Sequence, residues 1–420
     1  MISKREVRQI AGFDVVLVPT RAATTTVRVV VNAGSAYESA RTFGCAHFLE
    51  HLFFKGSRHR GYEVINREIA ALGEANAYTD CDRTVFHIDT LGPDAPRALE
   101  ILCELLFEPM LDPAEFERER GAILEEWQSR RDSPWSAFYD AAAAAVLTAP
   151  FDVPVIGTRD RIEDLRVTDL HAFRDTHYTR GNIAFVLAGD LAHVDIDMLE
   201  RVLASVSVPN GPTNLLPPGG LRAQPPDIIL QTTHPAEQAI VSLWMPVPTD
   251  AQDRAQAYAT SILFNALGGG AHSILYDRIR EKAGIAYSVG AHEMHYDSLA
   301  AGVVIAATSP ENAGRCLDIM RGTLAELADN LMDEDLERVA RTNCLFGLAT
   351  LDNTPSGLAS CFLDRHFRTR RELDTSARGY LEARSVFHGP RKDAVREVAR
   401  EVVRAALPRM VAFIQNGDRL

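Results

Sequence analysis

Hydrophobic residues recur in the same order in the two halves of this sequence. Short apolar runs typical of strands occupy residues 14–19 and 27–34 in the first half and residues 227–232 and 240–247 in the second. Each half also closes with an apolar run that ends in Gly-Asp, at Asp190 and at Asp418. The matching runs lie 213 residues apart at the front of each half and 228 at the back. This spacing indicates a duplicated domain with insertions.

Between these runs, apolar residues recur with the period of an amphipathic helix. The first half carries such patterns at residues 46–55, 62–72, 95–107 and 113–130. The second half carries them at residues 252–267, 271–283, 310–330 and 333–350. Strands at both ends of each half, with helices between them, predict an α+β fold.

A segment rich in proline and glycine, residues 208–227, divides the chain near its midpoint. A chain of 420 residues is also too long for one ordinary hydrophobic core. We therefore expect two homologous domains, residues 1–207 and 228–420, joined by a linker at residues 208–227.

Composition and charge indicate which classes of protein this chain can belong to. Hydrophobic residues make up 46% of the chain and charged residues 24%, which is typical of a globular protein. The formal net charge of −13 argues against a general binder of nucleic acid or anionic membranes. We find no apolar run long enough to span a membrane and no signal-peptide pattern, so we expect a cytoplasmic protein. The 6 cysteines include no CxxC pair, which favours reduced core thiols over disulfides or a thiolate zinc site.

The strongest chemical signal is the segment His47-Phe48-Leu49-Glu50-His51. On a helix, residues four apart lie on one face, so His47 and His51 can bind the same metal ion. Glu50 shares that face and can act as a general base on a water molecule. The apolar neighbours favour partial burial, and buried ionisable groups need partners, which a divalent metal ion supplies. This H-x-x-E-H order is the inverzincin pattern.

A third ligand is expected from the acidic pattern at residues 113–130. Glu119 and Glu126 are seven residues apart and face the same side of a helix, whereas Glu125 points about 100° aside. One of the first two can bind the metal while the other supports the site. By itself this pattern is also compatible with a solvated helix face.

Together these residues resemble the pitrilysin or insulinase family of zinc metallopeptidases, which includes mitochondrial processing peptidase. The matching segments are residues 44–57, 74–86, 117–127 and 267–289. The resemblance implies that His47, His51 and Glu126 bind one zinc ion per chain, that Glu50 is the base and that Glu119 is an additional active-site glutamate. Glu125 remains the fallback ligand.

The same resemblance suggests how substrate is held. Asn76 and Ala77 match the start of an edge strand that pairs with an extended peptide substrate. Arg280 and Tyr287 match a pair that contacts the substrate and stabilises charge on the carbonyl oxygen. The residues just before this pair, 271–274, depart from the family's usual serine followed by arginine or proline.

The resemblance also implies an architecture and an assembly. Each domain is expected to be an antiparallel sheet packed with helices, the N-terminal one binding zinc and the C-terminal one carrying Arg280 and Tyr287. Together they would form one half of a clam-shaped chamber, so we expect a homodimer, with a heterodimer with a related subunit as the alternative.

The leading hypothesis for function is a zinc metalloendopeptidase that cuts extended peptides or unfolded segments, such as leader peptides. The alternatives are a non-catalytic partner or scaffold subunit of a heterodimeric peptidase, and a module that binds peptides without cutting them. The complete set of His47, Glu50, His51 and Glu126 argues against both alternatives.

Overall fold

The computed structural model describes residues 6–225, 228–248, 254–296, 298–360 and 394–416. The described chain forms two compact units. The first comprises residues 6–129, 153–216 and 350–360, and the second comprises the described parts of 130–152, 217–349 and 394–416. Residues 208–220 of the expected linker belong to no helix or strand, and the domain limits at 207 and 228 stay a prediction.

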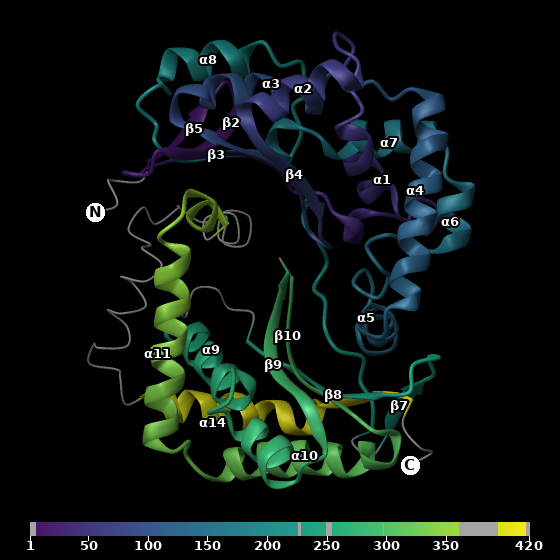
Figure 1. Ribbon diagram of the computed structural model, residues 1–420, viewed down its shortest axis with the longest axis vertical. Coiled ribbons are helices and arrows are strands. Elements are labelled where there is room, and N and C mark those ends of the chain that lie inside the picture. The colour runs from purple at the N-terminus through teal and green to yellow at the C-terminus, as the bar shows by residue number, and fades with distance from the viewer. Residues whose placement is uncertain (1–5, 226–227, 249–253, 297, 361–393, 417–420) are drawn as a thin grey trace. The chain divides into compact units, whose positions relative to one another are not determined.

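The first unit contains a six-stranded sheet with the order β1-β2-β6-β3-β5-β4. Figure 1 labels four of these strands, β2, β3, β4 and β5. Its strands are β1 Glu6–Ile10, β2 Phe13–Pro19, β3 Thr24–Val31, β4 Gly73–Thr79, β5 Thr84–Leu91 and β6 Ile183–Gly189. Strands β2 and β6 are parallel, because a long helical connection brings β6 back in the direction of β2, and the other pairs are antiparallel. Strand β4 therefore lies at one edge of the sheet.

The second unit repeats this topology with the order β7-β11-β8-β10-β9. Its strands are β7 Ile229–Thr232, β8 Ala239–Pro246, β9 Ala286–Tyr296, β10 Leu299–Thr308 and β11 Val411–Gln415. The order matches β2-β6-β3-β5-β4 strand for strand, and β7 and β11 form the equivalent parallel pair. The duplicated α+β fold is thus confirmed, although each sheet is mixed rather than purely antiparallel.

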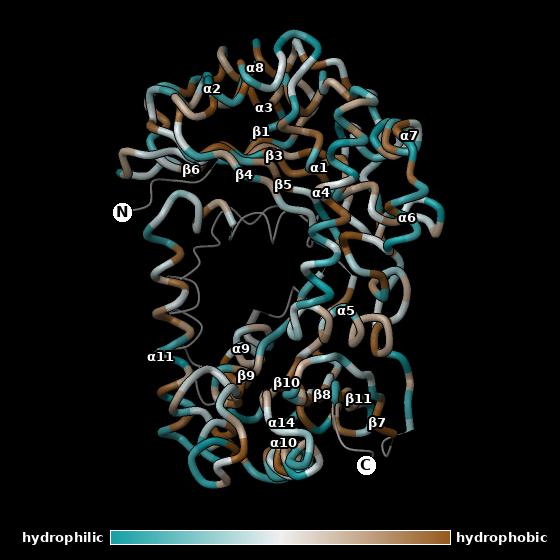
Figure 2. Tube along the Cα trace, turned by 45° about the vertical axis from the view of Figure 1, so that its right-hand side comes forward, coloured by the Kyte–Doolittle hydropathy of each residue, from teal (hydrophilic) through white to brown (hydrophobic). Residues whose placement is uncertain are grey.

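Some helices of the first unit pack against its sheet, and others pack beside them. They are α1 Cys45–Phe53, α2 Tyr62–Leu72, α3 Ala95–Phe107, α4 Pro113–Asp132, α6 Arg159–Asp164, α7 Val167–His177 and α8 Ile196–Ala204. Several show both hydrophobic and hydrophilic stretches, as expected of helices with one buried face (Figure 2). The second unit contains α5 Pro134–Val146, α9 Arg254–Gly268, α10 Ala313–Asp329, α11 Glu334–Leu351 and α14 Ala394–Ala406.

Of the eight helices expected at stated ranges, six agree with the structure to within two residues, and α2 and α3 match at both ends. The expected helix at 271–283 is shorter. Residues 271–273 form a turn, and the helical segment that follows includes a π-helix at Tyr276–Lys282. The preceding Gly270 has a φ of +134°, a conformation outside the helical region, so the helix begins later than its apolar pattern suggests.

Packing fixes the helix that carries the H-x-x-E-H segment. Phe48, Leu49, Leu52 and Phe53 of α1 are buried in the core of the first unit. The ring of Phe48 stacks on Phe116 of α4 at a centroid distance of 4.4 Å, and Phe53 stacks on Phe86 of β5 at 4.0 Å. With one face of α1 held in this way, the polar residues between these positions project from the other face.

Candidate metal centre

His47 and His51 lie one helical turn apart on α1, with ring centroids separated by 4.7 Å. Glu126 of α4 approaches both rings. Its Oε2 atom lies 3.7 Å from Nε2 of His47 and 3.4 Å from Nε2 of His51. Two ligand atoms of a tetrahedral zinc ion, each roughly 2.0 Å from the metal, are about 3.3 Å apart. The three side chains therefore have the spacing that such an ion requires.

The chemistry of these three side chains fits zinc as well as their spacing does. One ligand atom from each lies within 4.8 Å of the others, and no other group of this kind occurs in the part of the chain that the structure describes. Two imidazoles and one carboxylate leave a fourth position for water, as in catalytic zinc sites. Glu125 is exposed and lies outside the group, so its position gives no support to its role as fallback ligand.

Glu50 lies beside the ligands and is held from β4. Its Oε2 atom accepts a hydrogen bond of 2.8 Å from the hydroxyl of Thr79, and the backbone of Thr79 also contacts the carboxylate. Burial raises the pKa of Glu50 above its ordinary value, although the hydrogen bonds of Thr79 oppose the shift. A carboxylate with a raised pKa is better suited to accept a proton than an exposed one.

The second ring nitrogen of His51 faces Glu119 of α4. The His51 Nδ1 and Glu119 Oε2 atoms are 3.2 Å apart, and Glu119 is only 8% exposed. Burial by itself lowers the pKa of His51, but the carboxylates of Glu126 and Glu119 more than offset this, so the net pKa is raised. The two glutamates expected to face the same way do so, one toward each nitrogen of the ring.

Two further residues anchor α1 and were not found from the sequence. Glu38 accepts hydrogen bonds from the backbone N–H groups of Gly44 at 2.8 Å and Ala46 at 2.7 Å, at the start of the helix. Burial raises the pKa of Glu38 to about 8. Beyond the other end of α1, Lys55 lies 2.6 Å from Oε1 of Glu119. An acidic residue shortly before a helix was the only sequence signal for the first contact.

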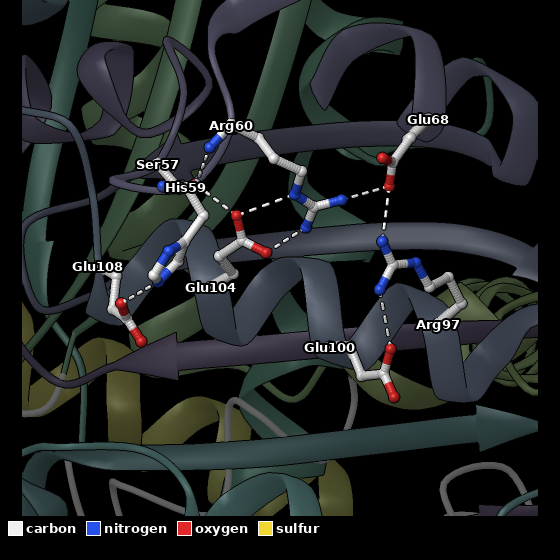
Figure 3. Close-up of polar contacts among 8 residues, drawn as sticks. All are labelled: Ser57, His59, Arg60, Glu68, Arg97, Glu100, Glu104 and Glu108. Atoms are coloured by element: carbon white, nitrogen blue, oxygen red, sulfur yellow. Dashed lines mark hydrogen bonds and ion pairs between the residues drawn. The ribbon is translucent and has the colours of Figure 1, made fainter. Parts of the chain in front are cut away.

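The loop after α1 is fixed by a network of charged residues (Figure 3). Arg60 contacts Glu68 of α2 and donates from Nε to Glu104 of α3 at 3.0 Å. Arg97 extends the network by contacting Glu68 at 2.7 Å. His59 contacts Glu108 at 2.6 Å. These contacts hold the loop against α2 and α3. The end of α1, which comes just before the loop, therefore has a defined position.

Asn76 and Ala77 lie within β4 rather than at its start, which is Gly73. Asn76 is exposed and Ala77 is half-buried. Among the described strands, β4 pairs with β5 alone, so its outer edge offers backbone groups to another strand. Because the same strand reaches Glu50 through Thr79, a peptide paired with this edge would run toward the metal centre.

Arg280 and Tyr287 belong to the second unit and contact each other. The guanidinium carbon of Arg280 lies 4.5 Å from the centroid of the Tyr287 ring, and Nη1 donates to the Tyr287 carbonyl oxygen at 3.2 Å. Tyr287 is 79% exposed, which is unusual for an aromatic residue. The Tyr287 ring therefore faces solvent with the Arg280 guanidinium packed against it.

No helix among the described residues combines the length and the apolar character needed to cross a membrane.

Comparisons with known proteins match both halves of the chain. Residues 14–158 match the family model described as Insulinase (Peptidase family M16), and residues 164–343 match Peptidase M16 inactive domain. A protein of Mycobacterium tuberculosis described as an uncharacterized zinc protease is 32% identical over 383 residues, which cover 90% of this chain and 84% of that protein. The mitochondrial-processing peptidase subunit beta of Bos taurus is 34% identical over 200 residues, 47% of this chain and 41% of the subunit.

Solved structures have the same fold. A protease from Helicobacter pylori matches with a TM-score of 0.83 and 21% identity over 99% of this chain and 100% of that one. A crystal structure from Pseudomonas fluorescens described as a peptidase M16 inactive domain matches with a TM-score of 0.84 and 19% identity, covering 99% and 98% of the two chains. By its sequence and by the two family domains that it matches, the chain belongs to the insulinase family, peptidase family M16.

Proposed function

We propose that this protein is a zinc-dependent endopeptidase that cuts extended peptides or unfolded segments. The observation that carries the proposal is the convergence of His47, His51 and Glu126 at zinc-ligand spacing with Glu50 beside them. Relatives described as zinc proteases support the same reading. The intact ligand set argues against the alternative of a non-catalytic partner or scaffold subunit.

Each residue of the metal centre has a separate role in the proposed hydrolysis. When bound by His47, His51 and Glu126, zinc would supply Lewis-acid polarisation of a water molecule and of the scissile carbonyl. Glu50 accepts the proton of the attacking water and later passes it to the leaving amine. The hydrogen bond from Thr79 would restrict the orientation of this carboxylate. With Nε2 of His51 on the metal, Nδ1 would carry the ring proton, and Glu119 would orient the ring by accepting a hydrogen bond from it.

The outer edge of β4 is the proposed binding surface for the substrate. Backbone pairing with residues near Asn76 and Ala77 accepts any extended peptide, so selectivity would have to come from side-chain contacts. A processing role, such as removal of a leader peptide, draws support only from the partial similarity to a mitochondrial-processing peptidase subunit. The cleavage-site profile on a peptide library would define the substrate class.

Arg280 and the exposed Tyr287 are proposed to act on the substrate from a facing chain in a homodimer. One sequence carries both the ligand set and this pair, so two identical chains would form two equivalent sites. A heterodimer with a related subunit is the alternative. Oxyanion contacts from a second chain would complete a site that is otherwise open to water.

Metal analysis and a mixing experiment test these proposals. We expect one zinc ion per chain, and peptide cleavage that stops on chelation and returns with zinc. Glu50→Gln chains mixed with Tyr287→Phe chains should regain activity, since one site of each mixed dimer would carry neither defect. A preparation without zinc, or one that cleaves unchanged after verified zinc removal, would overturn the metallopeptidase. Failure to regain activity after verified exchange of chains would overturn the shared site alone.

A further inference from the structure

Both carboxylate oxygens of Glu119 are engaged. Oε2 lies 3.2 Å from Nδ1 of His51, and Oε1 lies 2.6 Å from the ammonium nitrogen of Lys55. Lys55 follows His51 by four residues, just past the end of α1. One carboxylate on α4 is thus held by two side chains that both come from the segment carrying the metal ligands.

The two contacts have different chemical consequences. A histidine that binds metal through Nε2 must carry its proton on Nδ1, and a carboxylate at Nδ1 selects that tautomer and fixes the plane of the ring. A carboxylate held at one oxygen can still rotate about its side-chain bonds. A charge-assisted contact at the second oxygen restricts that rotation.

Lys55 is itself restrained. Its side chain is 23% exposed, and its ammonium lies 5.2 Å from the centroid of the Tyr62 ring, at the range of a cation–π contact. Tyr62 is the first residue of α2. Lys55 therefore connects Glu119 to the start of α2, and these two contacts restrict its side chain.

We propose that Lys55 is a positioning residue of the metal centre, which acts through Glu119 to hold His51 with Nε2 directed at the metal. The proposal rests on the zinc-binding role of His51 proposed above. Lys55 contacts no ligand directly in the described interactions, and its influence passes through the carboxylate that it fixes. Its effect should therefore vanish when Glu119 can no longer serve as the intermediary.

The surroundings favour a substitution that leaves the fold intact. Lys55 and Glu119 border an open depression of about 630 Å³, which is also lined by Tyr62, Val64 and Arg118. Water can enter the space left by the ammonium, so its removal does not strand Glu119 in an apolar core. Lys55→Met keeps most of the aliphatic stem that packs beside Tyr62.

A double-mutant cycle on zinc affinity provides the test. Lys55→Met should weaken zinc binding by roughly tenfold, within the range measured for groups that orient metal ligands, and Lys55→Arg should restore most of the loss. In a Glu119→Gln background, Lys55→Met should change the affinity by less than about twofold. Arg118→Met is the matched control, because Arg118 borders the same depression but pairs with Glu115.

Unchanged zinc affinity in Lys55→Met, or an equal loss with and without Glu119, would overturn the positioning role. Should Lys55→Met fail to fold, Lys55→Gln and Lys55→Arg decide in the same way. A wild type that binds no zinc would instead overturn the proposed function.

Discussion

Replacing Glu126 with glutamine should weaken zinc binding without unfolding the protein. The carboxylate is 40% exposed, so the dielectric constant of water is the cautious choice for its attraction to a divalent ion. At a metal–oxygen distance of about 2.1 Å, that attraction amounts to roughly 4 kcal/mol. Glutamine keeps an oxygen dipole, and water can take part of the vacated position. We therefore expect a loss of about 2–3 kcal/mol, roughly 30- to 150-fold in affinity.

Competition with a chromophoric chelator at fixed pH measures this loss, and thermal unfolding of the metal-free proteins checks that both variants fold. Glu125→Gln is the matched control, because Glu125 is the adjacent residue of α4 but is exposed and outside the ligand group. Its zinc affinity should stay within about threefold of the wild type, as expected for a screened surface charge. If Glu125→Gln loses zinc while Glu126→Gln retains it, the assignment of the third ligand is wrong.

Three further predictions concern the other unit, the loop network and the core. Arg280→Ala and Tyr287→Phe should leave zinc binding and the melting temperature unchanged but lower kcat/KM for peptide cleavage by at least roughly tenfold. Normal cleavage by both variants would mean that this pair has no role in catalysis. Burial alone raises the pKa of Glu104, but hydrogen bonds from Arg60 and Ser57 lower it below 4.5. The stabilisation is therefore fully present above pH 4.5 and is lost as the pH falls through the lowered pKa of Glu104. Glu104→Gln should cost about 1.5–3 kcal/mol in urea unfolding at pH 7 and progressively less as the pH falls through that pKa; a cost that does not change with pH contradicts this. Leu52→Ala, which empties a fully buried position on α1, should lower the unfolding free energy by about 2–5 kcal/mol, whereas Leu215→Ala, at an exposed position, should change it by less than about 0.5 kcal/mol.

The local part of the site could be predicted because it depends on helical spacing. The four-residue interval between His47 and His51 places both on one face of α1 wherever that helix lies. The seven-residue interval between Glu119 and Glu126 likewise puts both on the face of α4 that meets α1. The repeated apolar runs identified three of the equivalent strand pairs, β2 with β7, β3 with β8 and β6 with β11, but not β4 with β9 or β5 with β10.

Contacts between elements could not be predicted in this way. Thr79 reaches Glu50 only because β4 lies beside α1, and Glu38 reaches the start of α1 only through the path of an irregular loop. The parallel pairing of β2 with β6 likewise depends on the course of the long connection between them. Side-chain periodicity carries no information on any of these three relations.

Glu50→Gln tests the central claim most directly, because it removes a proton acceptor without removing a ligand. The amide can still accept the hydrogen bond of 2.8 Å from Thr79, so the local structure should persist. We predict that the variant binds one zinc ion per chain as tightly as the wild type and cleaves peptides at least roughly a hundredfold more slowly. Zinc retained with cleavage at the wild-type rate would contradict the account.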